Sequence, residues 1–345
     1  MISRLLVAAF IASILFTYGF QGFAQSTNSL TIDGTKEEFK PSGKIYGDLF
    51  VNGNYNLDDQ FGSFRLNRLH FAYKYQFTRN WYFNGMIESA LEDYSPIAQG
   101  GDYNNITNLF EFCMGYSSDK LNAKFGLIGT ELNQQQEKLW KHRYVDKVYA
   151  DKYGLAPTND FGFLVIYKIS PKFKIDVAVT NGEGHKNLQA DSSFRYAGGA
   201  TWRINQHLIA RAYADMVNYS GSIQSNFIGI VGYNNKFFNV GVEWNQQYNS
   251  LWNDGFHKNG YSAYLNGNLN PKLQVFTRYD YVSSNQPIDF AFRWNEQNDG
   301  SLIITGVQYE MIKQVQVAVN YRSWRSAQEN SNPASYIFLD LALSF

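Results

Sequence analysis

The stretch Phe64–Phe77, FRLNRLHFAYKYQF, alternates apolar and polar residues over most of its length. One face of an extended chain would carry the apolar side chains of Leu69, Phe71, Tyr73, Tyr75 and Phe77. The opposite face would carry the polar side chains of Arg68, His70, Lys74 and Gln76. Successive side chains of a strand point to opposite faces, so the alternation predicts a strand that is apolar on one surface and wet on the other. About ten residues of this kind are typical of a strand that crosses a bilayer in a β-barrel.

The same alternation recurs along the chain and predicts sixteen strands. They lie near residues 43–53, 63–77, 81–92, 107–117, 121–129, 160–169, 173–182, 194–205, 208–217, 224–234, 237–248, 259–270, 273–284, 300–310, 315–325 and 335–345. The strand predicted at 224–234 is apolar on both faces, which leaves its register open.

The connections between these strands alternate in length. Seven are short, at residues 78–80, 117–120, 170–172, 205–207, 234–236, 270–272 and 311–314. Eight are longer, at residues 54–62, 93–106, 130–159, 183–193, 218–223, 249–258, 285–299 and 326–334. Tight turns on the periplasmic side and extended loops outside are typical of up-and-down barrels. Because lipid leaves no partner for an unpaired amide, we expect an all-β, closed, antiparallel transmembrane barrel of about sixteen strands.

The N-terminal region is typical of an exported protein. Residues 1–24 are predicted to be a signal peptide, with a positive charge at Arg4, an apolar run and Ala24 before the cleavage point. A membrane-anchor helix is the alternative, although the apolar run is short for a span. Residues 25–42 show no periodicity and are predicted to form a periplasmic tail, which leaves residues 43–345 for the barrel.

The C-terminal strand ends in the sequence LDLALSF. Its apolar face carries Leu341, Leu343 and the terminal Phe345. This ending resembles the C-terminal aromatic signal of bacterial outer-membrane proteins, which the barrel-insertion machinery reads. We therefore expect the mature chain to lie among the lipids of the outer membrane of a Gram-negative bacterium.

Composition excludes several other classes of protein. Thirty Lys and Arg balance thirty Asp and Glu, whereas a nucleic-acid-binding protein usually has a basic excess. Hydrophobic residues make up 44% of the chain and no repeated runs of about twenty occur, which excludes a multi-span helical membrane protein. A single Cys excludes a disulfide framework.

The interior of the predicted barrel would be wet. Sixteen strands enclose a lumen too wide for side chains to fill, so the lumen-facing positions are expected to be polar. Their charges are nearly balanced, and pairing between strands is an alternative to a role in transport for any one of them. The predicted lumen-lining residues are Arg68, Lys74, Glu88, Glu111, Lys124, Arg195, Arg203, Arg211, Asp215, Glu243, Arg278, Asp280 and Arg322.

The third long connection differs from the others because its middle, residues 137–149, looks helical. Trp140, Tyr144 and Val148 recur every fourth residue and would form one apolar stripe. We expect this stripe to pack on the inner wall while the basic face borders a constriction. A solvated helix that caps the barrel is the alternative. The predicted constriction residues are Lys138, Trp140, Lys141, Arg143, Tyr144 and Lys147.

Several segments resemble a known family. Gln135–Lys147, Asp151–Leu155, Asp160–Gly162 and Thr180–Gly184 are similar to segments of porin-like outer-membrane proteins of Bacteroidota, which are related to the phosphate-selective porin O and P family. The resemblance implies a sixteen-stranded channel, often trimeric, for passive diffusion of small hydrophilic solutes. It does not imply phosphate specificity, because the phosphate-selective members use ladders of Arg and Lys and the inward charges here are nearly balanced.

The sequence offers no signal for catalysis. The five His residues show no metal-ligand spacing, and no Walker loop or dinucleotide fingerprint occurs, so we expect neither a cofactor nor an enzyme. The leading prediction is a porin with a weak anion preference that comes from the basic third connection. A non-conducting barrel with a structural, adhesive or surface-binding role is the main alternative. A hydrolase whose site is assembled from distant strands is a further one.

Overall fold

The computed structural model describes residues 39–91, 105–187, 189, 191–288, 294–328 and 331–345. The predicted signal peptide at 1–24 and nearly all of the predicted tail at 25–42 lie outside this part of the chain. The barrel belongs to one compact unit, residues 41–345.

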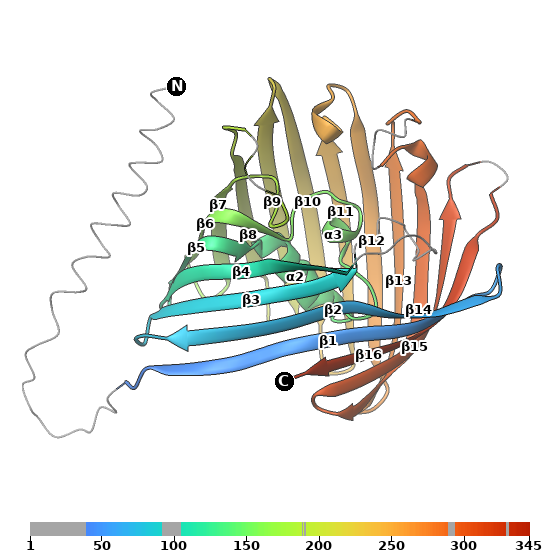
Figure 1. Ribbon diagram of the computed structural model, residues 1–345, viewed down its shortest axis with the longest axis horizontal. Helices are drawn as coiled ribbons and strands as arrows, with labels where there is room; N and C mark the ends of the chain where they lie inside the picture. Colours follow the sequence, from blue (N-terminus) through green and yellow to red (C-terminus); the bar gives the residue numbers. More distant parts are fainter. Residues whose placement is uncertain (1–38, 92–104, 188, 190, 289–293, 329–330) are drawn as a thin grey trace, which may run out of the picture. The chain divides into compact units, whose positions relative to one another are not determined.

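Sixteen strands carry the fold, as the sequence predicts (Figure 1). In chain order they are β1 Ser42–Asn56, β2 Phe61–Gln76, β3 Trp81–Leu91, β4 Asn105–Ser117, β5 Leu121–Gly129, β6 Asn159–Lys168, β7 Phe173–Thr180, β8 Arg195–Arg203, β9 Leu208–Tyr219, β10 Ser222–Asn234, β11 Phe238–Tyr248, β12 His257–Asn268, β13 Leu273–Ser284, β14 Gly300–Ile312, β15 Val315–Ser326 and β16 Ala334–Ser344. Two 3-10 helices, η1 Ser250–Trp252 and η2 Glu296–Asn298, lie in longer connections.

Every strand pairs antiparallel with its neighbours in the chain, and β1 pairs with β16 to close the barrel. At this seam Gly47 and Phe345 exchange two backbone hydrogen bonds of 3.1 Å each. The sheet therefore has no free edge, as a span through hydrocarbon requires.

One connection differs from the prediction at 218–223. There, Ser220 and Gly221 alone join β9 to β10, and both have positive φ angles, 50° and 92°. Two consecutive residues of this kind make the tight hairpin turn whose twist matches the flanking strands. This connection is therefore a two-residue turn rather than a loop.

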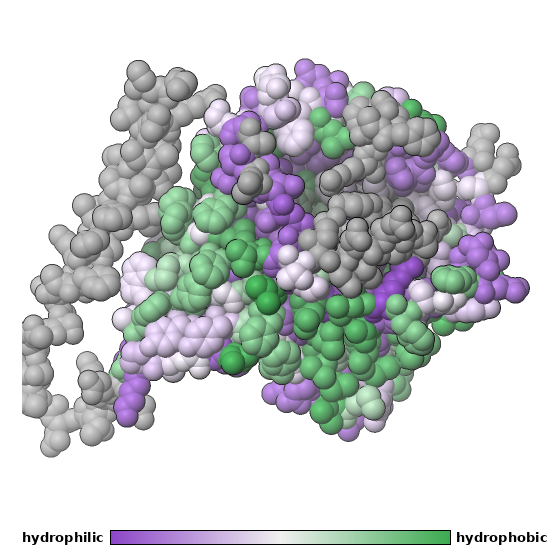
Figure 2. Space-filling view, in the orientation of Figure 1, coloured by the Kyte–Doolittle hydropathy of each residue, from purple (hydrophilic) through white to green (hydrophobic). Residues whose placement is uncertain are grey.

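The outer surface of the barrel is apolar, as expected. Figure 2 shows hydrophobic residues over much of the visible wall, and hydrophilic residues at the top, at the right and along the lower edge. In β10, Phe227 and Val231 are exposed on the outside, whereas Ile228 and Ile230 are buried inside, which fixes the register that the sequence left open. In β16, Leu339 lies outside and Asp340 inside, so the predicted alternation of the C-terminal strand is confirmed.

The prediction of a polar inner wall is incomplete for one half of the barrel, where the predicted Arg278, Asp280 and Arg322 lie inside among large apolar side chains. Strands β12 to β16 turn large apolar side chains inward, among them Tyr264, Phe276, Leu302, Ile304, Trp324 and Phe338. These side chains form one buried cluster with the third long connection, residues 130–158, which we call the inner loop. The inner loop folds into the lumen and packs its apolar side chains against them, so they are shielded from water.

The helical part of the inner loop also differs from the prediction. Helix α2, Glu131–Trp140, begins earlier than expected, and α3 is a single turn, Tyr149–Lys152. The helix ends because Lys141 adopts a left-handed conformation with φ of 67°. Side-chain amides of the barrel wall then hydrogen-bond to the last carbonyl groups of the helix. Asn239 donates to the backbone carbonyl of Leu139, and Asn266 donates to that of Trp140. Periodicity predicted the burial of the apolar residues, but these wall contacts set the end of the helix.

In the described residues no helix is long and apolar enough to cross a membrane.

Candidate functional site

The inner loop packs against one side of the lumen and leaves open space on the opposite side. Trp140 packs on Tyr264 and Phe276, with ring centroids 5.6 and 6.1 Å apart. Tyr144 donates a 2.8 Å hydrogen bond to Gln308 of β14. Between the loop and the wall formed by β1 to β5 lies a cavity of about 450 Å³, which we call the lumen cavity.

Two β-bulges shape the wall of the lumen cavity. In β2 the pairing register shifts at Asn67, so Asn67 and Arg68 both face the cavity although they are consecutive. In β4 the register shifts between the partners of Met86 and Ile87, which turns both Phe110 and Glu111 inward. A bulge inserts one extra residue into a strand and re-aims its side chain. The two bulges thus place more side chains on this wall than strict alternation allows.

The wall carries a chain of charges between β1, β2 and β3. His70 lies 3.3 Å from Asp48 and 2.9 Å from Glu88, and Arg68 lies 3.4 Å from the same Glu88 oxygen. The Phe110 ring lies 4.5 Å from the His70 ring, tilted by 38°, and the Arg68 guanidinium lies over it at 5.3 Å. The buried charges are thus held in fixed positions.

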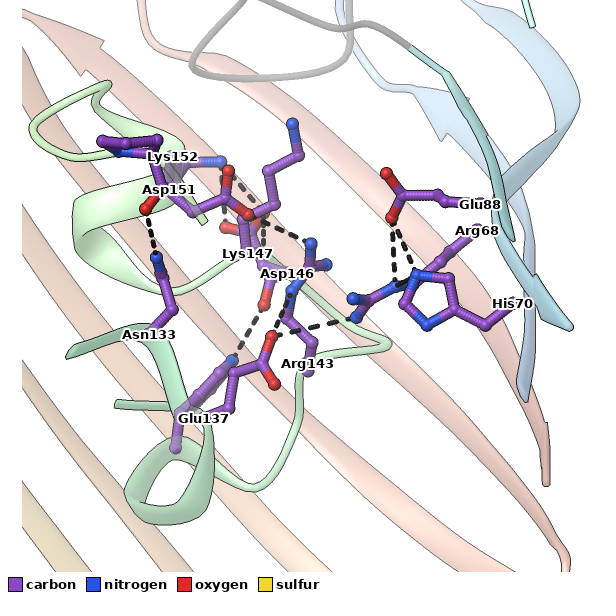
Figure 3. Close-up of polar contacts among 12 residues, drawn as sticks. Arg68, His70, Glu88, Asn133, Glu137, Arg143, Asp146, Lys147, Asp151 and Lys152 are labelled. Carbon is purple, nitrogen blue, oxygen red and sulfur yellow. Dashed lines mark hydrogen bonds and ion pairs between the residues drawn. The ribbon is translucent and has the colours of Figure 1, made fainter. Parts of the chain in front are cut away.

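This chain continues across the lumen to the inner loop (Figure 3). Arg68 reaches Glu137 of α2 at 3.8 Å. Glu137 in turn contacts Arg143 at 3.2 Å, and Arg143 contacts Asp151 of α3 at 3.1 Å. Wall and loop are therefore joined by alternating positive and negative groups, which we call the charge network.

A second group of residues lines the cavity farther along the wall. Tyr46 donates to Asn84 at 2.7 Å, and the Lys74 ammonium lies 4.2 Å from the centre of the Tyr82 ring. Glu111 accepts a 2.8 Å bond from Lys124, which the sequence predicts to line the lumen. The lumen cavity thus offers hydrogen-bonding groups and charges of both signs to a small solute.

Charged groups of the inner loop have shifted pKa values. Burial works against the charged form of Arg143, but the carboxylates of Asp151 and Glu137 outweigh it and raise its pKa. Burial also opposes ionisation of Asp146, yet Lys152 and nearby arginines lower its pKa to about 2. Burial lowers the pKa of His142 to about 4. Around neutral pH the loop therefore holds fixed ionic charges and one neutral imidazole.

The structure brings seven predicted residues together around the lumen cavity: Arg68, Lys74, Glu88, Glu111, Lys124, Arg143 and Lys147. Other predicted lumen residues are buried in ion pairs of the opposite wall, namely Arg195 with Asp215, Arg278 with Asp280, and Arg322 with Asp340. Arg211 is held in the same way by Asp176, and Glu243 accepts from Gln136 of α2. Charge pairing between strands, the alternative to a role in transport, applies to Arg195, Arg211 and Arg322. Arg278 and Asp280 pair within β13 instead.

Three predicted residues lie elsewhere. Lys141 donates to Asn234 near a short turn, Lys138 is exposed on α2, and Arg203 is exposed at the end of β8. None of the three lines the lumen cavity. Trp140 and Tyr144 anchor the loop and do not border the opening.

Sequence reasoning also missed several residues of the site. Glu137 and Asp151 were not selected as site residues, although the fold makes them the acids of the charge network. Strict alternation beside the inward Glu111 would turn Phe110 outward, and the bulge in β4 turns both residues inward. His185, from the connection after β7, reaches Glu88 at 3.7 Å and contacts Phe110. No sequence signal marks these long-range contacts. In the described part of the chain, no three His, Cys, Asp or Glu side chains are grouped so as to hold a metal.

Comparisons with known proteins are informative at the level of structure. No protein-family model and no curated protein sequence matches the chain. Among solved structures, it resembles OmpF of Salmonella typhi in complex with daunomycin, with a TM-score of 0.66 and 10% identity over 88% of this chain and 97% of that chain. It also resembles the anion-selective porin from Comamonas acidovorans, with a TM-score of 0.64 and 12% identity over 89% and 100%.

A loop L8 deletion mutant of OmpT, an outer-membrane protein of Vibrio cholerae, gives a TM-score of 0.64 and 13% identity over 88% and 99% of the two chains. At such identities the likeness shows the fold alone. The fold is that of outer-membrane, porin-like β-barrels, and it agrees with the outer-membrane location predicted from the sequence.

Proposed function

We propose that this chain is an outer-membrane porin through which small hydrophilic solutes and ions diffuse passively. The supporting observation is the lumen cavity, a polar space of about 450 Å³ that the inner loop leaves unfilled beside the β1–β5 wall. The charge network borders this space and would set the size and charge of the solutes that pass. The proposal involves no catalysis and no cofactor.

A weak preference for anions is part of this proposal. Four carboxylates that line the lumen cavity each contact an arginine or a lysine, namely Glu88, Glu111, Glu137 and Asp151, whereas Asp48 contacts His70. In the described residues, no carboxylate lies within the 4.0 Å ion-pair distance of Lys74 or Lys147. Unbalanced positive charge in a narrow lumen attracts small anions, and salt screens the effect. Phosphate specificity is not proposed.

Export and assembly are proposed on sequence grounds. Residues 1–24 would be removed as a signal peptide, and Leu341, Leu343 and Phe345 would be read by the barrel-insertion machinery. A homotrimer and a relationship to porin-like proteins of Bacteroidota rest on the resemblance of residues 135–184.

A non-conducting barrel is a second candidate, because the Arg68–Glu137 contact bridges the lumen from wall to loop. Single-channel recording of the purified, detergent-solubilised protein in a planar bilayer separates the two. We expect discrete ohmic steps from protein that also shows a heat-modifiable gel shift, the sign of a folded barrel. Folded protein that inserts into the bilayer but gives no steps would rule out the porin and favour the structural role.

A further inference from the structure

A row of three lysines crosses β5 to β7 at the end of the barrel where the short turns lie, which we call the short-turn mouth. Lys168 of β6 and Lys174 of β7 are directly opposite each other. The backbone N–H of Lys168 donates to the carbonyl oxygen of Lys120 at 2.8 Å, so Lys120 stands on its other side. The three strands are neighbours in the sheet (Figure 1), and residues opposite each other share a face.

This face is the lumen face. Lys174 contacts the carboxylate of Glu131 on α2, inside the barrel. Lys172 lies two residues before Lys174 and therefore has the same facing. The backbone N–H of Arg203 donates to the carbonyl oxygen of Lys172 at 2.7 Å, which continues the patch onto β8. Five bases, which we call the mouth patch, line this part of the lumen wall: Lys120, Lys168, Lys172, Lys174 and Arg203.

The charge of the mouth patch is largely unbalanced. Lys174 has Glu131 as its partner. Within the described part of the chain, no carboxylate lies within the 4.0 Å ion-pair distance of the other four side chains, which are exposed. Like charges directly opposite each other destabilise a sheet. Mobile anions that gather in front of the patch would offset this repulsion.

The opposite wall of the same mouth has no such excess. There, the backbone N–H of Glu310 donates to the carbonyl oxygen of Lys272 at 2.8 Å. An acid and a base thus lie side by side, and their charges balance. The positive field of the short-turn mouth is therefore concentrated at β5 to β8.

The other mouth, formed by the longer connections, carries the opposite charge. Two bases lie there, Lys186 and Arg195. Apart from the inner loop, the described residues of these connections and the strand residues beside them hold seven acids, namely Asp58, Asp59, Glu183, Asp191, Asp254, Glu296 and Asp299. The lumen thus runs from a basic mouth to an acidic one, although the chain as a whole has no net charge.

We propose that this asymmetry makes the channel directional, with the mouth patch as the place where anions gather before they enter the lumen. The inference rests on the porin proposal and adds a direction to its anion preference. Short turns of such barrels face the periplasm, so the anions would gather on the periplasmic side.

The direction follows from the signs of the two mouths. A voltage that makes the solution at the longer connections positive drives anions inward from the mouth patch and cations inward from the acidic mouth. Both ions then accumulate in the lumen and the current rises. The opposite voltage draws both ions out of the lumen and the current falls.

The test records single channels of the full-length protein in a planar bilayer with equal salt on both sides. At about 0.1 M salt and about 100 mV, we expect the current to be about 1.5-fold larger when the side of the longer connections is positive, because a Debye length of about 10 Å still lets the patch act on passing ions. At about 1 M salt the Debye length falls to about 3 Å, and the steps should be ohmic.

Two double variants separate the mouth patch from the other short turns. Lys168→Gln/Lys172→Gln should make the currents at the two polarities nearly equal. Lys236→Gln/Lys313→Gln, the matched control, removes two exposed bases from other short turns and should keep the wild-type ratio. The Lys236 ammonium lies 4.8 Å from the centre of the exposed Phe237 ring, in the turn between β10 and β11.

The orientation of each channel is read from a biotin attached at Gln328→Cys, an exposed position between β15 and β16. Streptavidin should change the current only when it is added on the side of the longer connections. Cys113, the one native thiol, is buried and does not compete for the label.

Equal wild-type currents at both polarities at the lower salt would overturn this proposal and leave the porin proposal intact, whereas the absence of steps at every salt concentration would overturn both. A larger current at the opposite polarity, or an equal change in both double variants, would also overturn it. A heat-modifiable gel shift shows that each variant is folded.

Discussion

The guanidinium of Arg68 on β2 lies 3.8 Å from the carboxylate of Glu137 on α2, and this contact joins the barrel wall to the inner loop. Arg143 holds the same carboxylate from the other side at 3.2 Å. Glu137 is thus the acid that balances two arginines at the point where the charge network crosses the lumen. If the lumen conducts, this carboxylate should act directly on its ion selectivity.

Glu137→Gln should shift the channel toward anions. The change leaves Arg68 and Arg143 without their shared carboxylate and adds one positive charge beside the lumen cavity. A unit charge about 5 Å from a passing ion in water is worth about 0.8 kcal/mol, which corresponds to roughly a fourfold change in permeability ratio at low salt. Reversal potentials under a salt gradient measure this ratio. Glu296→Gln is the matched control, because it removes an exposed carboxylate of η2 that does not line the cavity. An identical shift in both variants would contradict the role of Glu137.

The basic residues of the inner loop should divide into two pairs. Arg143 and Lys147 line the lumen cavity, whereas Lys138 and Lys141 do not. Arg143→Gln/Lys147→Gln should therefore lower the anion-to-cation permeability ratio, and Lys138→Gln/Lys141→Gln should leave it near the wild-type value. High salt should reduce the difference, because the Debye length is only about 10 Å at 0.1 M. The same reversal-potential measurement checks both pairs. A larger effect from the second pair would show that the cavity is not the selective part of the lumen.

The packing of the inner loop should weaken in acid. Burial lowers the pKa of His142 from 6.5 to about 4, so the fold favours the neutral ring. The stabilisation is complete above pH 6.5 and is lost progressively as the pH falls toward 4, by up to about 3 kcal/mol. Hydrogen exchange of residues 141–153 should accelerate between about pH 7 and pH 4.5, after correction for the intrinsic rate. His142→Gln should remove most of this dependence, whereas His207→Gln, in a short turn, should keep it. Equal pH dependence in wild type and His142→Gln would disprove the assignment.

The seam between β1 and β16 should be intolerant of side-chain volume at Gly47. A β-carbon there would press against the carbonyl oxygen of His70 and the ring of Phe345. Overpacking of this kind costs about 1–3 kcal/mol, so Gly47→Ala should reduce the fraction of heat-modifiable, folded barrel. Gly198→Ala is the control, since a β-carbon at that position meets only one atom within 4 Å, at 3.8 Å. Similar folded fractions for the two variants would show that the seam is not closed as described.

Much of the fold follows from local pattern. All sixteen strands were predictable, because a wall between lipid and lumen requires side chains of alternating character along every strand. Alternation gave the wrong facing of side chains where a β-bulge interrupts a strand. The bulges near Asn67 and Phe110 shift the alternation by one residue, and no residue type in either segment announces the shift.

The candidate site was predictable only in part. Arg68, Glu88 and Lys124 were predicted to line the lumen because they occupy alternate, inward-facing positions of their strands. Glu137 and Asp151 were not selected, because their importance arises from contact with Arg143 and, through Glu137, with a strand far away in the sequence. Lys138 and Lys141 carry the same charge as Arg143, and their sequence neighbourhood did not distinguish them.

By itself, the sequence determined the strand count, the closed topology and the apolar outside, since these follow from the demand of lipid that every amide be paired and every outward side chain be apolar. The tertiary structure decided which half of the lumen is filled. The inward apolar residues of β12 to β16 depart from the polar lining that alternation predicts. The tertiary structure explains them, because the inner loop packs against them. Their burial fixes the loop on that side, and the space that remains beside β1 to β5 is set by contacts between residues far apart in the chain, which local pattern does not encode.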